Sequence, residues 1–334
     1  MSSAAKRPSS EQSDSNGIVV PEKREKTEAE TSSMPSILRL RGFYSYRKGE
    51  REDMQDEHVI SDQLAEPTGQ EMSAEICRLA YYAVFDGHNG PRAAKFAGET
   101  LHANLIHRLP AGPDLKTVEQ SLKRCFTESY KKTDELFLSD AAKAKPAWKD
   151  GTTATTILVI NNSAFVANIG DSKAILCRYK PEEEKEIALT LTKDHSPQLF
   201  EERMRIQKAG GSVKDGRILG VLEVSRSIGD GQYKNHGVTC VPDVKKCTLT
   251  ANDRYLLIAC DGLWKTFTNQ QVLDYVADLV KQAQECIKTV STEGKTLEQT
   301  RWESVCSSLA AEAVRRGSGD NVTVVVVVIG DWLL

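Results

Sequence analysis

LAYYAVFDGHNG, residues 79–90, joins a run of apolar, β-forming side chains to a polar turn. The run predicts a buried strand over 79–85. Asp86, Gly87 and His88 follow at its C-terminal end, where the strand fixes their position and the turn leaves them accessible. Two interpretations are open for this stretch by itself. It is either an ordinary turn built from Asp and Gly, or part of a catalytic or metal site.

The composition excludes some classes of partner. The 334 residues are 40% hydrophobic and 27% charged, and the formal net charge is −3. This balance argues against nucleic-acid binding driven by bulk charge. No apolar stretch approaches the roughly 20 residues needed to span a bilayer, and the N-terminus lacks a signal-peptide pattern. We therefore expect neither a nucleic acid nor a membrane as a partner.

The cysteines and the N-terminal segment bear on location and domain organisation. The 8 cysteines include no Cys-x-x-Cys pair, which favours reduced thiols over disulfides or zinc. Residues 1–36 are rich in Ser, Glu, Lys and Ala and contain no aromatic residue, which predicts a disordered leader before one ordered domain over 37–332. Two short basic clusters in the leader are more often solvated charge than import signals. We expect a cytoplasmic protein, with the nucleus as a second location.

Short apolar runs predict many strands. They lie near 39–45, 57–60, 79–85, 154–160, 163–169, 173–178, 187–191, 255–260 and 322–329. Consecutive strands with tight turns favour antiparallel pairing. Apolar residues at helical spacing predict helices after Pro91, from Leu115, after Thr268 and from Leu297. Ser196 and Pro197 open a charged helix that is expected to end at Gly210 and Gly211. The expected fold is α+β: a four-layer sandwich with two central, mostly antiparallel β-sheets flanked by pairs of helices.

The pattern at Asp86 recurs. Asp171 and Asp261 each follow an expected strand, and Asp320 stands just before the last one. Because antiparallel neighbours place the end of one strand beside the start of the next, we expect Asp86, Asp261 and Asp320 to meet at one edge of a sheet. Crowded carboxylates need a cation or a proton to coexist. Oxygen ligands favour magnesium or manganese over zinc, and Gly87 lets its backbone carbonyl approach an ion closely.

Two ordinary explanations compete with this hypothesis. Asp-Gly turns end strands in many proteins, although three occurrences make that explanation weaker than one would. Residues 47–56 form a charged loop, and such a run is usually a solvated surface. Beside a metal centre, however, an arginine in that loop would suit a phosphate, because a guanidinium donates two parallel hydrogen bonds.

An ordered set of eight motifs resembles the type 2C, metal-dependent protein phosphatases. The resemblance covers about residues 40–330. The motifs are M-Q-D-x-H (54–58), V-F-D-G-H-x-G (84–90), D-G-T-T-A (150–154), A-N-I-G-D-S (167–172), S-R-S-I-G-D (225–230), V-P-D (241–243), A-C-D-G-L-W (259–264) and G-D-N-V-T (319–323). Three segments further resemble the integrin-linked-kinase-associated branch of that family, namely residues 145–151, 201–211 and 227–234.

The resemblance implies a site with two Mg²⁺ or Mn²⁺ ions per subunit. Asp86 would bridge both ions, the carbonyl of Gly87 would bind one, and Asp261 and Asp320 would complete the other. Asp56 corresponds to an acidic residue that orients metal-bound water. The expected catalytic domain, 37–332, would hydrolyse phosphoserine and phosphothreonine on proteins by attack of a water that bridges the ions.

Two further residues receive catalytic roles from the resemblance. Arg51 aligns with an arginine that binds the phosphate, and His88 would be the general acid that protonates the leaving oxygen. General-acid assistance is typically worth about 10²–10⁴-fold in rate. The expected partners are phosphorylated proteins, including components of kinase signalling, and we expect a monomer.

Three residues depart from the family pattern. Asn89 stands where Gly is usual, and Asn tolerates a positive φ. Gln55 replaces a commoner Glu. Lys265 stands where many relatives have an Asp that is linked to a third, weaker metal. A lysine there would repel such an ion, so a third site using Asp171 is not expected.

Residues 195–241 form a long, glycine-containing connection that corresponds to the family's flap beside the active site. Within it, Arg226 and Asp230 are either partners in salt bridges of the flap or substrate contacts, and we expect the structural role. Two other functions remain open: an inactive scaffold that binds phosphoproteins, and a two-metal phosphohydrolase acting on nucleotides or nucleic acid. The complete set of acidic residues argues against the scaffold, and the absence of a P-loop argues against the second.

Overall fold

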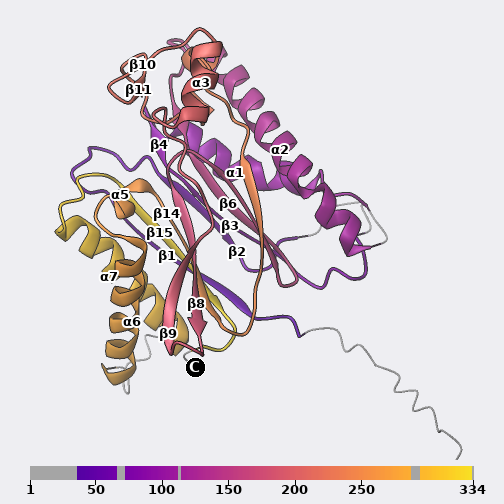
Figure 1. Ribbon diagram of the computed structural model, residues 1–334, viewed down its shortest axis with the longest axis vertical. Helices are drawn as coiled ribbons and strands as arrows, with labels where there is room; N and C mark the ends of the chain where they lie inside the picture. Colours follow the sequence, from indigo (N-terminus) through magenta and orange to yellow (C-terminus); the bar gives the residue numbers. More distant parts are fainter. Residues whose placement is uncertain (1–35, 66–71, 112–113, 287–293, 333–334) are drawn as a thin grey trace, which may run out of the picture. The chain divides into compact units, whose positions relative to one another are not determined.

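Two five-stranded antiparallel sheets form the centre of the fold (Figure 1). The computed structural model describes residues 36–65, 72–111, 114–286 and 294–332, the last three residues of the 114–286 range by backbone alone. The first sheet has the order β13 (Asp243–Thr248), β7 (Ser163–Ile169), β6 (Ala154–Ile160), β3 (Leu79–Phe85) and β2 (Glu57–Ser61). The second has the order β1 (Leu40–Arg47), β15 (Val322–Ile329), β14 (Asp253–Ala259), β8 (Lys173–Lys180) and β9 (Lys185–Thr190).

Two pairs of long helices cover the outer faces of these sheets. The first pair is α1 (Arg92–Ile106) and α2 (Leu115–Lys143), and the second is α6 (Asn269–Cys286) and α7 (Leu297–Arg315). Figure 1 shows α6 and α7 on one side of the sheets and α1 and α2 on the other. A capping box stands at the start of α6: the Thr268 N–H donates to Gln271 Oε1 at 2.9 Å, and the Gln271 N–H donates to Thr268 Oγ1 at 3.3 Å.

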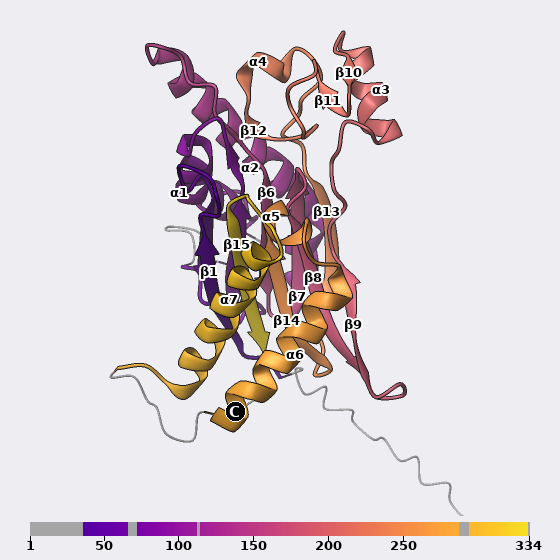
Figure 2. The ribbon, with the colours of Figure 1, turned by 90° about the vertical axis from the view of Figure 1, so that its left-hand side faces the viewer.

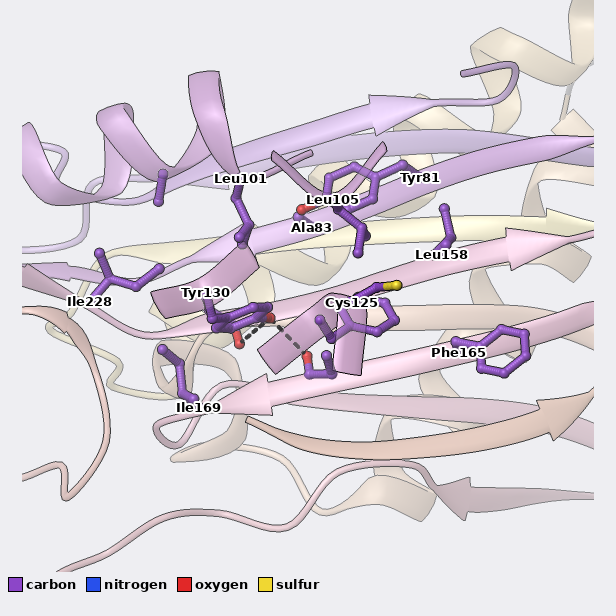
Figure 3. Packing of buried hydrophobic residues seen from close by; sticks show 14 of the residues in the cluster. Tyr81, Ala83, Leu101, Leu105, Cys125, Tyr130, Leu158, Phe165, Ile169 and Ile228 are labelled. Carbon is purple, nitrogen blue, oxygen red and sulfur yellow. Dashed lines mark hydrogen bonds between the residues drawn. The ribbon is translucent and has the colours of Figure 1, made fainter. Parts of the chain in front are cut away.

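Strand β3 shows why the layers form. All seven of its residues are buried, because alternate side chains face two different cores. Ala80, Tyr82 and Val84 belong to the core between the two sheets, and Tyr81 and Phe85 belong to the core under α1 and α2. Figure 3 shows this second core, with Tyr81 and Leu101 among its residues. The last strand, β15, is likewise buried along its whole length. The predicted four-layer α+β sandwich is confirmed.

All nine expected strands occur with boundaries shifted by at most two residues, but β13 was not predicted. Its sequence, DVKKCT, is partly exposed and carries two lysines, as an edge strand often does. The helix expected from Ser196 begins at Phe200, because Ser196–Leu199 form a turn closed by the Leu199 N–H and the Ser196 carbonyl at 3.1 Å.

The segment 195–241 contains short elements with a small core of their own. They are α3 (Phe200–Lys208), β10 (Val213–Lys214), β11 (Arg217–Ile218), β12 (Ile228–Gly229) and α4 (Gly231–Lys234). The core is formed by Ile206, Ile218, Leu222, Val224, Tyr233 and Val238. In Figure 2, α3, α4, β10 and β11 lie together beyond one end of the sheets. We call residues 195–241 the flap region.

Two further expectations concern the N-terminal leader and membrane crossing. The disordered leader over 1–36 lies outside the described residues, apart from Ser36, and stays a prediction. Among the helices that the structure describes, none has the length and apolar character required for a membrane crossing.

Candidate active site

Carboxylates from both sheets meet at one end of the sandwich. Asp86 follows β3 of the first sheet, whereas Asp261 opens the short helix α5 (Asp261–Trp264) after β14 of the second. Asp320 precedes β15, which pairs with β14 through Ala259 and Val324. From the sequence, Asp86, Asp261 and Asp320 were expected to meet at the edge of one sheet. That placement is wrong for Asp86, because face-to-face packing of two sheets, not strand pairing, brings it to the others.

The oxygens of these groups lie close together. Asp86, Asp171 and Asp261 each offer one oxygen, and these three atoms lie within 4.8 Å of one another. Asp86 and Asp56 form a second such group with the Cys260 thiol. Asp320 belongs to neither group. Asp320 is connected to Asp261 through Lys265, whose Nζ lies 2.6 Å from Asp261 Oδ2 and 3.1 Å from Asp320 Oδ2.

Burial and mutual repulsion raise the pKa of several of these carboxyls. Burial is the main cause for Asp56 and Asp171, each with a pKa raised to about 7. For Asp86, burial followed by the charges of Asp56 and Asp261 raises the pKa well above its usual range. Asp320 differs: burial alone would raise its pKa, but the hydrogen bond and charge of Lys265 lower it. Such a cluster is suited to cations, which remove the repulsion.

Two buried atoms of the cluster fit a metal centre. Within the described part of the chain, the Oδ1 atoms of Asp56 and Asp261 are buried and accept no hydrogen bond. A buried carboxylate oxygen without a donor is costly. The other oxygen of Asp56 accepts a hydrogen bond from Thr323 Oγ1 at 2.7 Å, which fixes the direction of the free one. An all-oxygen donor set of this kind is typical of Mg²⁺ and Mn²⁺ sites.

The turn after β3 is held by backbone contacts. Gly87 and His88 form strand β4, which pairs with β5 (Gly151–Thr152). A Cβ atom at position 87 would collide with the Gln55 carbonyl oxygen, so only glycine fits there. The next residue but one, Asn89, has φ +58°, a left-handed conformation that Asn tolerates.

Gln55, one of the departures from the family pattern, supports the same turn. Its Oε1 accepts a hydrogen bond from the Gly90 N–H at 3.1 Å, and its own N–H donates to Asn321 Oδ1 at 2.8 Å. Gln55 therefore ties the turn that carries Asp86, through its side chain, to the segment that carries Asp320, through its backbone N–H. An amide can do this without adding another negative charge to the cluster.

His88 is bound to the flap region. Its Nε2 lies 2.7 Å from Asp230 Oδ2, which also accepts a hydrogen bond from Ser227 Oγ at 2.7 Å. Burial of the His88 ring favours the neutral form, but the charge of the fully buried Asp230 outweighs it, and the pKa of His88 is raised. The expectation that Asp230 acts only within the flap missed this contact.

Arg226, in contrast, has the expected structural role. Its guanidinium binds Glu202 Oε1 at 2.7 Å and Asp243 Oδ1 at 2.9 Å, and it donates to the Val241 carbonyl at 3.0 Å. The Glu202 side chain is almost fully buried and also binds Arg205 at 2.7 Å. These contacts join α3 to the segments that follow it.

Arg51 lies at the rim of the site. Its Nε and Nη2 atoms lie 3.0 Å from the Oδ1 and Oδ2 atoms of Asp320, respectively, and 62% of its side chain is exposed. Together with the carboxylates it lines a cavity of about 500 Å³, whose opposite wall comes from the flap region. The lining includes Arg51, Asp86, His88, Asp171, Asp261, Lys265 and Asp320, with Val221, Leu222, Glu223, Val224 and Tyr233 from the flap.

The residues that support the site were not predicted from the sequence. Thr323, which binds Asp56, is an ordinary strand residue in the sequence, and nothing marks it. Cys260, like the other cysteines, was expected only as a reduced thiol, although it stands beside Asp261. Asp171 was expected at most as a ligand of a doubtful third ion, but it is one of the three carboxylates grouped around Asp86. Its Gly-Asp turn after a strand was the available signal.

Residues 42–322 match the family model described as protein phosphatase 2C. The chain belongs to the protein phosphatase 2C family. The expected enzyme class, a protein phosphatase, is therefore confirmed at the level of the family, and this family is metal-dependent. The acidic cluster around Asp86 is consistent with that dependence.

Individual protein phosphatase 2C members agree with this assignment. The chain is 52% identical to the human integrin-linked kinase-associated serine/threonine phosphatase 2C, over 98% of this chain and 80% of the relative. It is 34% identical to the probable protein phosphatase 2C 8 of Arabidopsis thaliana, over 84% and 76%. The resemblance to the integrin-linked-kinase-associated branch is confirmed.

A solved structure supports the fold separately. The serine-threonine phosphatase 2C of Toxoplasma gondii superposes with a TM-score of 0.68 and covers 87% of this chain and 95% of its own. Its sequence identity is 22%, so this likeness concerns the fold alone.

Proposed function

We propose that this protein phosphatase 2C member hydrolyses phosphoserine and phosphothreonine on proteins, with two Mg²⁺ or Mn²⁺ ions at the acidic cluster. The observation that carries the proposal is that Asp86, Asp171 and Asp261 lie together in a cavity that also contains His88 and Arg51. The carboxylates would bind the ions, the arginine would bind the phosphate, and the imidazole would protonate the leaving group. The names of the relatives support the same substrate class.

Five residues would hold the ions and the nucleophile. Asp86 belongs to both groups of potential ligands and would bind both ions. Gly87 would offer its carbonyl to one ion, and Asp261 and Asp320 would bind the other. Asp56 would orient the attacking water through its free Oδ1. When bound, two divalent ions lower the pKa of a water and neutralise charge on the phosphoryl group.

Arg51 and His88 would act on the substrate. An exposed guanidinium that now pairs with Asp320 can turn to a phosphate, which offers the same bidentate geometry. His88 would donate a proton to the seryl or threonyl oxygen as it leaves. Because Nε2 of His88 is bound to Asp230, Nδ1 is the nitrogen left to carry that proton.

The direct test is metal-dependent release of phosphate. The purified protein should release phosphate from a phosphothreonine peptide in Mn²⁺ and stop when EDTA is added. Activity that persists in the chelator would overturn the metal mechanism. An inactive scaffold, the alternative function, would bind the phosphopeptide with no turnover under either condition.

Partners and location follow as parts of the same proposal. The human relative is named for its association with integrin-linked kinase, and we propose phosphorylated components of kinase signalling as partners of this chain too. We propose that it acts as a monomer, in the cytoplasm and also in the nucleus. Affinity capture of Asp86→Asn, which would retain substrates, tests the class of partner.

A further inference from the structure

A tight loop of the flap region displays two apolar side chains. The loop spans residues 218–222 and is closed by reciprocal backbone hydrogen bonds. The Ile218 N–H donates to the Leu222 carbonyl at 2.8 Å, and the Leu222 N–H donates to the Ile218 carbonyl at 3.2 Å. Both of these residues are buried in the core of the flap region, whereas Leu219 and Val221, between them, are exposed. The loop is therefore anchored at its two ends and presents its middle to solvent.

The backbone of this loop is held in an unfavourable conformation. Leu219 has φ +51°, in the left-handed region that residues with a Cβ rarely adopt, and Gly220 follows with φ +75°. The Leu219 N–H donates to the Ser212 carbonyl at 2.9 Å, and the Val221 N–H donates to the Ile218 carbonyl at 3.0 Å. Strained residues persist where the surrounding structure fixes them, and they cluster at ligand-binding sites. These contacts hold Val221 in one position before a ligand binds.

Apart from Glu223, apolar and aromatic side chains line the flap wall of the active-site cavity. Leu222 and Tyr233 contribute to this wall but are almost fully buried, whereas Val221 is 60% exposed. Of the large apolar side chains that are exposed in the described part of the chain, only Val221 lines this cavity. Phe200, on α3, is 69% exposed but does not line it. Val221 is therefore the side chain by which the flap region offers apolar surface to a ligand of this cavity.

We propose that Val221 forms a subsite for the side chain next to the phosphoresidue, so that the site prefers substrates with an aliphatic residue there. The inference rests on the proposed function, which brings a phosphoprotein into this cavity of about 500 Å³. Consecutive residues of an extended peptide lie about 3.3 Å apart, so the neighbour of the phosphoresidue also lies in the cavity. Contact with Val221 removes apolar surface from water, and a loop that is already fixed loses little entropy. Glu223, in the same wall, repels an acidic residue.

The test measures binding of phosphopeptide analogues that are not hydrolysed. Each peptide carries a difluoromethylphosphonate in place of the phosphate of phosphothreonine, and one neighbouring residue is leucine, serine or glutamate. The dissociation constants are measured by fluorescence anisotropy with the full-length protein in Mn²⁺, and the residues before and after the phosphothreonine are varied separately. On the flank that faces the flap region, leucine should bind about tenfold more tightly than serine, and glutamate more weakly. Equal dissociation constants for leucine and serine on both flanks would overturn the inference.

Three variants assign the preference to Val221. Val221→Thr keeps the branched shape and replaces a methyl group by a hydroxyl, so the preference for leucine over serine should fall. Val221→Lys places a cation in the wall and should reverse the order, so that the glutamate peptide binds more tightly than the leucine peptide. Phe200→Ser is the matched control, because it removes an exposed apolar side chain of the same region that does not line the cavity. A preference that Val221→Lys leaves unchanged, or that Phe200→Ser lowers equally, would contradict the inference.

Turnover separates this inference from the proposed function. With hydrolysable phosphothreonine peptides, the same preference should appear in KM and leave kcat nearly equal, because Val221 would contact the substrate equally in the ground state and the transition state. A preference in kcat with equal KM values would argue against the subsite. A preference in binding without any Mn²⁺-dependent release of phosphate would overturn the proposed function and leave the subsite in place.

Discussion

Nε2 of His88 lies 2.7 Å from Oδ2 of Asp230, although 142 residues separate them in the chain. The contact joins the turn after β3 to the flap region. Asp230 is held firmly, because its N–H donates to the Asp150 carbonyl at 2.9 Å and Ser227 Oγ binds its carboxylate. The flap region thus provides not only a wall of the cavity but also the group that orients the proposed general acid.

This contact predicts a change in the pH profile of Asp230→Asn. A general acid acts while it is protonated, so the raised pKa of His88 extends activity to higher pH. Without the charge of Asp230, burial lowers the pKa of His88, and the alkaline limb of kcat/KM should move to lower pH. The measurement is a pH profile with a phosphothreonine peptide.

Ser227→Ala provides the control for that prediction. It removes one hydrogen bond from Asp230 and keeps the carboxylate charge, so its alkaline limb should move much less. An aryl phosphate, whose leaving group needs little protonation, should also be less sensitive to Asp230→Asn. Equal losses on both substrates would argue against His88 as the general acid.

Asp86→Asn should abolish turnover and leave the fold intact. Asp86 belongs to both groups of potential ligands, so its loss should reduce phosphate release by about 10³-fold or more. The same change removes a charge that its neighbours repel, and the melting temperature in EDTA should stay equal or rise. A marked fall in that temperature would show that Asp86 acts mainly in the fold.

Asn89 should accept glycine but not a β-branched residue. Its φ of +58° lies in the left-handed region, which costs most L-residues about 1–2 kcal/mol. Asn89→Gly should keep activity and stability, whereas Asn89→Val should lower the free energy of unfolding by that amount. Urea unfolding measures the difference, and equal stabilities of both variants would contradict the strain argument.

Glu202→Gln should destabilise the flap region in a pH-dependent manner. Burial alone would raise the pKa of Glu202, but its bonds to Arg205, Arg226 and Ser225 lower it. A carboxyl whose pKa is lower in the folded state stabilises the fold at pH values above its unfolded-state pKa of about 4.3. That stability is lost as the pH falls below this value. At pH 7 the variant should lose about 3 kcal/mol of stability, as broken buried ion pairs do.

Denaturant unfolding at pH 7 and at acidic pH checks this prediction. The difference between wild type and Glu202→Gln should shrink as the pH falls. Glu201→Gln is the control on the same helix, because the Glu201 side chain is 79% exposed and pairs with Lys193 at 3.5 Å. A deficit of Glu202→Gln that does not change with pH would contradict the role of its charge.

The sequence by itself determined the strands whose side chains are apolar on both faces. Four strands occur with the predicted boundaries, because burial on two faces requires a continuous apolar run. They are the strands 79–85, 154–160, 163–169 and 322–329. The edge strand β13 was not predictable in this way, because its exposed side chains leave no such run. The residue types Asp, Gly and His at strand ends likewise indicated a metal site.

Tertiary structure alone decided how those residues meet. Asp86 lies beside Asp261 because two sheets pack face to face, and periodicity within one strand carries no information about that packing. The contacts of His88 with Asp230 and of Lys265 with Asp320 have the same origin. Each joins groups that are distant in sequence, and only the arrangement of buried layers brings their charges to contact distance.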